Sequence, residues 1–299
     1  MLNFKQITLS DKKQIDACLQ GNNYRVCDFC FANLFAWQTK FKTLFTIVQD
    51  TLFLCFKDDN NQFYYLMPVG KMPLKKALLL IKKDAENKCI PFQMKGVSDK
   101  MREEIQQAIP NEFHYKSDRD NDEYVYLSEK LITLTGKKLQ SKRNHINRFK
   151  TEFPDWQYAP VETEKDCAEC LSMLKTWETK HNPDGKWEER YDFIATKIML
   201  EHFHDLQLRG GLIRVNGKIV AFSIGEPLTV DTFCVHVEKA FSEVPGAYAI
   251  INQQFVEHAA SEFIYINREE DMGLENLRKA KMSYYPDILL QEGVVNSAP

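Results

Sequence analysis

The sequence predicts an α+β protein with two similar halves, each a mixed and mostly antiparallel sheet flanked by helices. Two observations predict it: one order of strands and helices occurs twice along the chain, and 299 residues suit about two domains. Hydrophobic residues make up 44% and charged residues 27% of the chain, which is usual for a globular protein. We place the first domain at residues 1–130 and the second at residues 131–299.

The first half is expected to run strand, helix, helix, three strands, helix, strand, helix, strand. Polar turns separate the three central strands, Pro73 suits a first helical turn, and Ser98 suits an N-cap. The elements are expected at residues 4–8, 10–19, 23–37, 43–49, 52–56, 62–69, 73–88, 91–95, 98–108 and 123–127.

The second half repeats this order after a basic helix. Asn216-Gly217 between two apolar runs is a strong hairpin signal. The basic helix is expected at residues 136–153, and the repeated elements at 156–159, 163–180, 188–206, 212–215, 218–224, 232–238, 246–260, 263–267, 273–283 and 288–294. The halves share little sequence, so the repeat is one of architecture.

This order is that of the Gcn5-related N-acetyltransferase (GNAT) fold, so we expect two tandem GNAT-like (acyl-CoA N-acyltransferase) domains. In such a domain two strands splay apart, and a helix N-terminus offers free backbone N–H groups to the gap. In the second half, the junction before the helix at 246–260 contains two adjacent small residues, Gly246 and Ala247. The matching junction of the first half, residues 69–74, has no such pair. We therefore expect the first domain to be non-catalytic and the second to hold the active cleft.

Charge and hydropathy exclude several classes of protein. The net charge of −3 gives no global attraction to nucleic acid or anionic membrane. No apolar run approaches the roughly 18 residues of a membrane helix, and the N-terminus lacks a secretory signal pattern, so we expect a cytoplasmic chain without an integral membrane segment. The eight cysteines, including the Cys27/Cys30 and Cys167/Cys170 pairs, are interpreted as packed thiols, and no metal site is expected.

The strand at residues 232–238 has an unusual polar pattern. Simple alternation places His236 and Glu238 on one face with Thr232 and Cys234. A polar face on a covered central strand indicates either a wet cleft or a buried network in which His236 and Glu238 satisfy each other. In a cleft, either side chain is a candidate base for an attacking amine.

The strand-to-helix junction that follows is the candidate donor site. Pro245 and Gly246 are expected to begin the helix, and small residues allow a ligand close to the backbone. The candidate residues are Val237, Pro245, Gly246, Ala247 and Tyr248. The alternative is an ordinary helix start with proline in its first turn.

The helix at residues 136–153 has six Lys or Arg residues and no acidic residue between positions 136 and 150. This bias favours a polyanionic ligand such as a nucleotide, a lipid head group or tRNA, whereas the alternative is a solvated basic helix. The candidate binding residues are Lys142, Arg143, Asn147 and Arg148.

A third cluster surrounds the last helix. Arg278, Lys281 and Tyr284 are three residues apart, which places them on one side of a helix. Such a row suits an anion, with Tyr284 as a phenolic acid for the leaving group and Asn267 as a further binding residue. The acidic residues before this helix are also explained by its dipole alone.

Five stretches resemble a known family: residues 28–37, 136–150, 217–227, 231–239 and 267–286. They look like a bacterial family related to the catalytic domain of phosphatidylglycerol lysyltransferase. The family is more distantly similar to Fem-type peptidyltransferases, which use aminoacyl-tRNA on a tandem GNAT scaffold. In place of that lysyltransferase's acidic and arginine-rich strand motif, this chain has His236-Val237-Glu238-Lys239.

The resemblance implies aminoacyl transfer from aminoacyl-tRNA to an amine or hydroxyl acceptor, with a small molecule or lipid head group as acceptor and tRNA as partner. It also implies a binding or catalytic role for Lys281, because Leu277 followed by this lysine matches the family pattern. We expect Glu238, with His236, to assist deprotonation. No tightly bound cofactor is expected, since the donor is a substrate. The alternatives are an acyl-CoA-dependent N-acetyltransferase and a non-catalytic binding protein.

Overall fold

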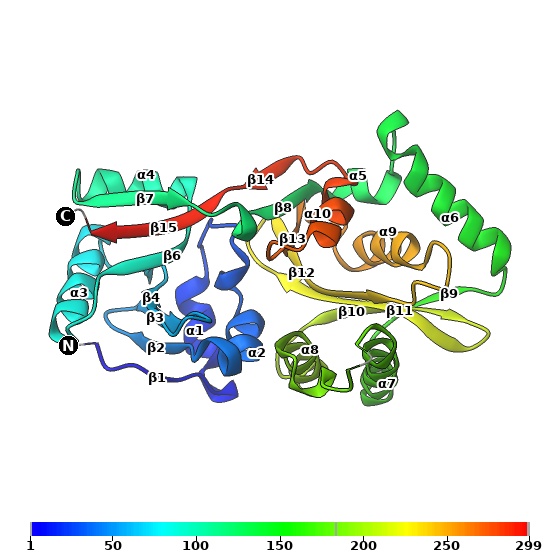
Figure 1. Ribbon diagram of the computed structural model, residues 1–299, viewed down its shortest axis with the longest axis horizontal. Coiled ribbons are helices and arrows are strands. Elements are labelled where there is room, and N and C mark those ends of the chain that lie inside the picture. The colour runs from blue at the N-terminus through cyan, green and yellow to red at the C-terminus, as the bar shows by residue number, and fades with distance from the viewer. Residues whose placement is uncertain (1, 183, 298–299) are drawn as a thin grey trace. The chain divides into compact units, whose positions relative to one another are not determined.

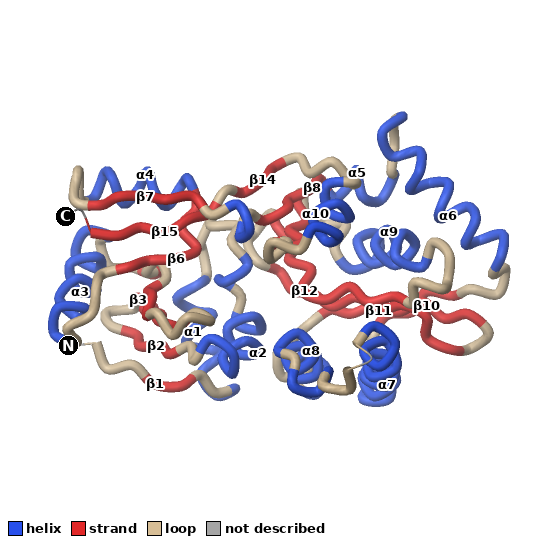
Figure 2. The backbone as a smooth tube through the Cα atoms, in the orientation of Figure 1, coloured by secondary structure: helices blue, strands red, loops and turns tan. Residues whose placement is uncertain are grey.

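A computed structural model describes residues 2–182 and 184–297 (Figures 1 and 2). The chain divides into two compact units. The first unit comprises Met1–Glu123, Glu270–Arg278 and Leu289–Pro299, and the second comprises Tyr124–Glu269 and Lys279–Ile288. Each has a mostly antiparallel sheet flanked by helices, so the predicted tandem GNAT-like α+β fold is confirmed.

In the described residues, the sheet of the first unit follows the order β1-β2-β3-β4-β6-β15-β7, with β5 paired to β3. Its strands are β1 (Lys5–Gln6), β2 (Leu44–Ile47), β3 (Thr51–Lys57), β4 (Phe63–Tyr65), β5 (Val69–Gly70), β6 (Gln93–Ser98), β7 (Phe113–Ser117) and β15 (Glu292–Ser297). Its helices are α1 (Lys12–Leu19), α2 (Phe31–Phe41), α3 (Leu74–Asn87) and α4 (Asp99–Ala108). Ser98 caps α4 as expected, since its side chain accepts the N–H of Met101.

The second sheet follows the order β14-β8-β13-β12-β11-β10-β9. Its strands are β8 (Glu123–Leu127), β9 (Gln157–Pro160), β10 (Arg209–Val215), β11 (Lys218–Pro227), β12 (Thr232–Ala240), β13 (Tyr265–Glu270) and β14 (Ile288–Leu290). The helices of this unit are α5 (Ser128–Thr133), α6 (Gln140–Glu152), α7 (Glu164–His181), α8 (Tyr191–Glu201) and α9 (Ala247–Ala259), and the residues of α10 (Glu275–Met282) are divided between the first unit and this one. In Figure 1, α9 covers one side of β10–β12, and α7 and α8 lie on the other.

The two predicted halves, 1–130 and 131–299, exchange strands. The strand at 123–127 was expected to close the first sheet, but β8 belongs to the second sheet. In the first sheet, β15 from the end of the chain pairs with both β6 and β7. The strand β7 was missed in the sequence, although Phe113 and Tyr115 alternate with polar residues there. Alternation identifies a strand but does not select its neighbour, which here comes from a distant segment.

The candidate site depends on how β12 ends its pairing with β13. These strands are parallel, and they pair from Thr232↔Tyr265 to Cys234↔Asn267. Beyond Cys234 the strands separate, as expected for a GNAT-like sheet. The other neighbour, β11, continues along β12, but its register shifts between Ile224 and Gly225, which oppose Val237 and Val235. His236 is therefore the extra residue of a β-bulge.

A candidate active site in the second unit

The bulge at His236 changes which side chains of β12 share a face. Phe233 packs against Phe255 of α9, with ring centroids 5.8 Å apart. Glu238 also contacts α9, although it is an odd number of residues from Phe233. His236 instead stays beside Cys234, whose Sγ lies 3.7 Å from its Nδ1. The expected shared face of His236 and Glu238 is therefore wrong, because one extra residue reverses the alternation beyond it.

Glu238 lies at the centre of a buried polar cluster. Its Oε1 accepts a hydrogen bond of 2.9 Å from Nη2 of Arg268, and its Oε2 accepts one of 2.9 Å from Nδ2 of Asn252. The Glu238 and Arg268 side chains are 13% and 11% exposed. A buried ion pair tolerates desolvation only when its partners are well placed, so removing either one leaves an uncompensated charge.

Two polar atoms of this cluster are buried without a hydrogen-bond partner in the described chain. They are Nη1 of Arg268, a donor, and Oδ1 of Asn252, an acceptor. Buried polar groups are usually satisfied, and a lost partner costs about 1–3 kcal/mol for a neutral group. A ligand that offers both an acceptor and a donor would satisfy both atoms.

Two cationic side chains of the cluster, those of Lys142 and Arg268, lie over the ring of Tyr284. The Nζ of Lys142 lies 4.1 Å from the ring centroid of Tyr284, and Cζ of Arg268 lies 5.0 Å from it. Burial, followed by the positive charge of Arg268, lowers the pKa of Lys142, while Glu238 opposes this shift. Among these side chains two cations face one carboxylate, so the cluster favours an anion or a developing negative charge.

Tyr284 lies beyond the end of α10 and is 5% exposed. Burial raises its pKa, Arg268 opposes the shift, and Glu238 adds to it. Its phenol therefore stays protonated at neutral pH and retains a proton to donate. The neighbouring Tyr126 contributes a ring 6.4 Å away and donates its hydroxyl to the carbonyl oxygen of Lys281 at 2.8 Å.

His236 forms a separate hydrogen-bond network. Its side chain is 1% exposed, with Nδ1 2.7 Å from Glu269 and Nε2 3.2 Å from Glu226. Burial opposes its charge, but Cys234 and then the hydrogen bonds to the two carboxylates raise its pKa well above the ordinary range. The polar face thus forms the network that the sequence left open, with partners other than Glu238.

The start of α9, which was predicted as a donor site, packs against α6. Gly246 is the N-cap of α9 at φ +84°, and Pro245 precedes it, so proline does not occupy the first helical turn. A side chain at Gly246 would collide with the carbonyl oxygen of His145 and with Cβ of Phe149 in α6. The close approach at this glycine is therefore made by another helix.

The other residues predicted at this junction are placed as follows. Ala247 is buried, and its N–H donates to the carbonyl oxygen of Val244 at 3.1 Å. The carbonyl oxygen of Val237 accepts the Ser223 hydroxyl at 2.7 Å. Tyr248 is 37% exposed.

Of the residues predicted on the basic helix, Lys142 reaches the Glu238 cluster. Arg143 donates to the carbonyl oxygens of Leu134 and Gly136, and so satisfies the end of the preceding segment. Arg148 forms an exposed ion pair with Glu152 at 2.6 Å, and Asn147 is exposed. Of the side chains on this basic helix, the ammonium of Lys142 is partly buried, whereas Asn147 and Arg148 lie at the surface.

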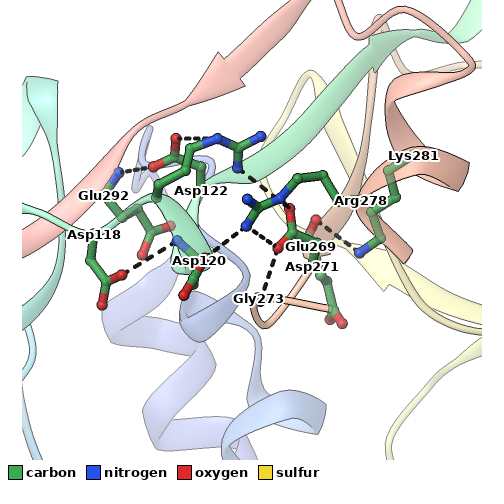
Figure 3. A network of polar contacts seen from close by, with 10 residues as sticks. Asp118, Asp120, Asp122, Glu269, Asp271, Gly273, Arg278, Lys281 and Glu292 are labelled. Atoms are coloured by element: carbon green, nitrogen blue, oxygen red, sulfur yellow. Dashed lines mark hydrogen bonds and ion pairs between the residues drawn. The ribbon is translucent and has the colours of Figure 1, made fainter. Parts of the chain in front are cut away.

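The predicted row on the last helix is also divided. In the first unit, Arg278 forms two hydrogen bonds of 2.8 Å with Asp271 and one of 2.7 Å with Asp120 (Figure 3). In the second unit, Nζ of Lys281 donates to the carbonyl oxygen of Glu269 at 3.1 Å. Asn267 is buried, and its Oδ1 accepts the N–H of Glu269 at 2.7 Å.

Sequence reasoning missed Arg268, Asn252 and Tyr126 as members of the cluster. Arg268 lies in the polar Asn267-Arg268-Glu269 segment, which the sequence singled out, but the sequence did not show that it pairs with Glu238. Asn252 had a weaker signal, an amide on an otherwise apolar helix face. These residues come together only through the sheet and its covering helix.

Two GNAT-like units, with a cationic cluster where two strands separate, define the class of the protein as acyltransferase-like. The chain belongs to the family described as phosphatidylglycerol lysyltransferase, C-terminal, which matches residues 22–292. Family and fold together support an acyltransferase related to lysylphosphatidylglycerol synthetases. Within the described residues, no helix combines the length and apolar character needed to cross a membrane.

Solved structures support this assignment of the fold. A conserved protein of unknown function from Bacteroides thetaiotaomicron VPI-5482 is 41% identical, with a TM-score of 0.93 and coverage of 100% of both chains. The C-terminal domain of a protein described as a lysylphosphatidylglycerol synthetase from Agrobacterium fabrum is 12% identical, with a TM-score of 0.67 over 96% of this chain and 91% of that one. L-PGS from Bacillus licheniformis is 14% identical, with a TM-score of 0.66 and the same coverage of both chains.

A curated sequence relative is the uncharacterized protein MYCGA3080 of Mycoplasmoides gallisepticum. It is 24% identical over 175 residues, which are 58% of this chain. The match spans about half of that relative's length, 55%.

Proposed function

We propose that the second unit transfers an aminoacyl group from aminoacyl-tRNA to an amine or hydroxyl acceptor. The observation that carries the proposal is the pair of buried, unpartnered atoms beside Glu238, Arg268 Nη1 and Asn252 Oδ1. An aminoacyl ester offers a carbonyl oxygen to the guanidinium and an ammonium or amine N–H to the amide oxygen. The similarity to a lysylphosphatidylglycerol synthetase domain favours a lipid head-group hydroxyl as acceptor.

The proposed chemistry is an acyl substitution at the ester carbonyl. The acceptor nitrogen or oxygen forms the new bond to the carbonyl carbon, and the bond from that carbon to the ribose oxygen breaks. Glu238 takes the proton of the acceptor, and Tyr284 gives its own proton to the departing ribose oxygen. Glu238 then releases its proton to solvent, and Tyr284 regains one from solvent. Arg268 and Lys142 stabilise the negative charge that develops on the carbonyl oxygen.

The contact at Gly246 supports aminoacyl-tRNA over acyl-CoA as the donor. A GNAT-like helix start can hold the phosphates of a donor when its backbone is accessible. Here the carbonyl oxygen of His145 lies where a side chain at Gly246 would be, and the N–H of Ala247 already donates to Val244. The donor is a substrate in this proposal, and no tightly bound cofactor is assigned to the reaction site. Because aminoacyl-tRNA is found in the cytoplasm, the proposal also places the protein there.

The test is transfer of a radiolabelled lysyl group from tRNA to vesicles that contain phosphatidylglycerol, with labelled acetyl-CoA and small amines in parallel reactions. We expect Glu238→Gln and Lys142→Met to lower transfer about 100-fold or more, as loss of acid–base and charge stabilisation does. The matched controls are Glu257→Gln and Lys175→Met, since both residues are exposed on helices of the same unit.

Each outcome has a distinct meaning. Transfer that is insensitive to Glu238→Gln and Lys142→Met contradicts the proposed site. Transfer from acetyl-CoA, with none from tRNA, contradicts the donor and supports an N-acyltransferase. If neither donor is used or bound, the protein is a non-catalytic member of the fold.

A further inference from the structure

A second buried cluster lies in the first unit, and the proposed transfer reaction does not use it. It combines the thiol of Cys27 with the carboxylates of Glu123 and Glu270, and their ligand atoms lie within 4.8 Å of one another. Cys27 and Glu123 are 6% and 2% exposed. The backbone N–H of Cys27 also donates to both carboxylate oxygens of Glu123, at 2.9 and 3.2 Å, which fixes that side chain beside the thiol.

Glu292, the first residue of β15, supplies an independent sign of a missing ligand. It is 4% exposed, and its Oε1 is buried without a hydrogen-bond partner in the described chain. Its acidic neighbours are Glu123, Asp28 and Glu270, and it shares a side-chain hydrogen bond with Glu123.

The same acids surround Gly96 of β6. A side-chain carbon at this glycine would lie 3.0 Å from Oδ2 of Asp28 and 3.7 Å from Oε2 of Glu292. Glycine thus leaves room for these carboxylates to approach the strand. Arg119 forms ion pairs with two other acids, at 3.7 Å from Asp122 and 3.4 Å from Asp271.

We propose that Cys27, Glu123 and Glu270 form a binding site for one divalent metal ion, with Zn²⁺ as the preferred ion and Glu292 as a neighbouring buried carboxylate. A thiolate together with carboxylates suits Zn²⁺, whereas Mg²⁺ and Ca²⁺ prefer all-oxygen ligand sets. On binding, Cys27 loses its proton to solvent and its sulfur becomes a ligand. Glu270 is only half-buried and provides the route of entry.

The site would hold together segments that are far apart in the sequence. Its three ligands come from the turn before α2, the start of β8 and the end of β13, and the neighbouring Glu292 begins β15. A bound ion offsets the repulsion among these acids and stabilises the folded state in proportion to its affinity. This role is separate from acyl transfer, and it does not depend on the proposed function.

The experiment measures Zn²⁺ binding to the full chain after treatment with a chelator, by titration calorimetry and by metal content after gel filtration. We expect about one equivalent of Zn²⁺, release of protons on binding, and a raised Tm. Cys27→Ser and Glu270→Gln should each weaken binding about tenfold or more. Cys55→Ser and Asp84→Asn are matched controls, because both residues are buried in the same unit.

Glu270→Gln is the decisive variant, since its half-exposed position makes a failure to fold less of a concern. Circular dichroism and the Tm without metal show whether each variant is folded. The proposal is overturned if the wild-type protein binds no stoichiometric Zn²⁺, or if folded Cys27→Ser and Glu270→Gln proteins bind it as tightly as wild type. Binding of Ca²⁺ or of an ammonium compound such as lysine amide, without Zn²⁺ binding, also overturns it.

Discussion

In each unit a hydrogen bond to a carboxylate joins the third central strand to the helix that follows it, and we call this contact a polar bridge. The two units differ in how the charge of that carboxylate is neutralised. In the first unit, Tyr65 of β4 donates to Asp84 of α3 at 2.7 Å, and Lys88, four residues after Asp84, forms an ion pair with it. In the second unit, Asn252 of α9 donates to Glu238 of β12.

The difference lies in where the positive charge comes from. Lys88 follows Asp84 by one helical turn, so the first bridge is balanced by a local partner. Glu238 is paired with Arg268 of β13 and has Lys142 of α6 nearby, and both come from distant segments. The charge of the first bridge is matched locally, and one atom of it, Oδ1 of Asp84, is buried without a partner in the described chain, whereas the second bridge keeps extra positive charge and two unpartnered polar atoms. This contrast explains why the second unit is the better candidate for chemistry.

The largest expected effect is that of Arg268→Met. It leaves the carboxylate of Glu238 buried without its ion-pair partner, and we expect the free energy of unfolding to fall by about 3–5 kcal/mol. Urea denaturation measures this loss. The double variant Arg268→Met/Glu238→Leu is the control and should recover much of the stability. A loss under about 1 kcal/mol for the single variant would mean that Glu238 is solvated.

The corresponding change in the first unit is Asp84→Asn, and its effect should be smaller. Lys88 keeps access to water, with its side chain 36% exposed, so its charge does not remain buried. We expect a loss of about 1–3 kcal/mol, chiefly from the hydrogen bond to Tyr65. A loss as large as that of Arg268→Met would contradict the contrast between the two bridges.

His236→Gln tests the His236 network through the pH dependence of stability. The raised pKa of His236 means that its charged form stabilises the folded state fully below the unfolded pKa of about 6.5, and that this stability is lost as the pH rises through the folded pKa. The variant should therefore be less stable than wild type by about 1–3 kcal/mol near pH 6, and the difference should shrink in the alkaline range. Chemical denaturation over a pH series measures it. A difference that is constant with pH would show that His236 is neutral.

Lys142→Met tests a pH dependence of stability that is opposite in sign to that of His236. The lowered pKa of Lys142 means that the unfolded chain binds its proton more strongly, so wild-type stability rises as the pH increases from the folded pKa toward about 10.5. The variant should lack this rise and differ from wild type by no more than about 1 kcal/mol at neutral pH. Thermal denaturation at several alkaline pH values measures it, and Lys175→Met is the exposed control.

The smallest effect concerns the surface of α6 and its preceding turn. If tRNA binds there, removing Lys137, Lys138 and Lys150, which are exposed, should weaken binding and reduce the slope of log K against log salt by about 2–3. Fluorescence anisotropy over a salt series measures the slope. Arg143 is unsuitable for this test because it satisfies backbone carbonyls. An unchanged slope would place the nucleic acid elsewhere.

Much of the fold was predictable because its signals are local. The Asn216-Gly217 hairpin, the Ser98 cap and the repeated order of elements depend on turn chemistry and periodicity within short windows. The exchange of β8 and β15 was not predictable, because pairing of distant strands is decided by the packing of the whole sheet. Glu238, Lys142 and Tyr284 were identified as candidates in separate motifs, but Arg268 and Asn252 were not linked to them.

The sequence by itself determined the α+β class, the tandem order of elements, the polar character of β12 and the family. Tertiary structure decided which polar groups meet. One bulge at His236 reverses the alternation of β12, so Glu238 joins α9 while His236 stays with Glu226 and Glu269. The physical reason is that side-chain direction along a strand accumulates residue by residue, and a single unpaired residue changes every direction after it.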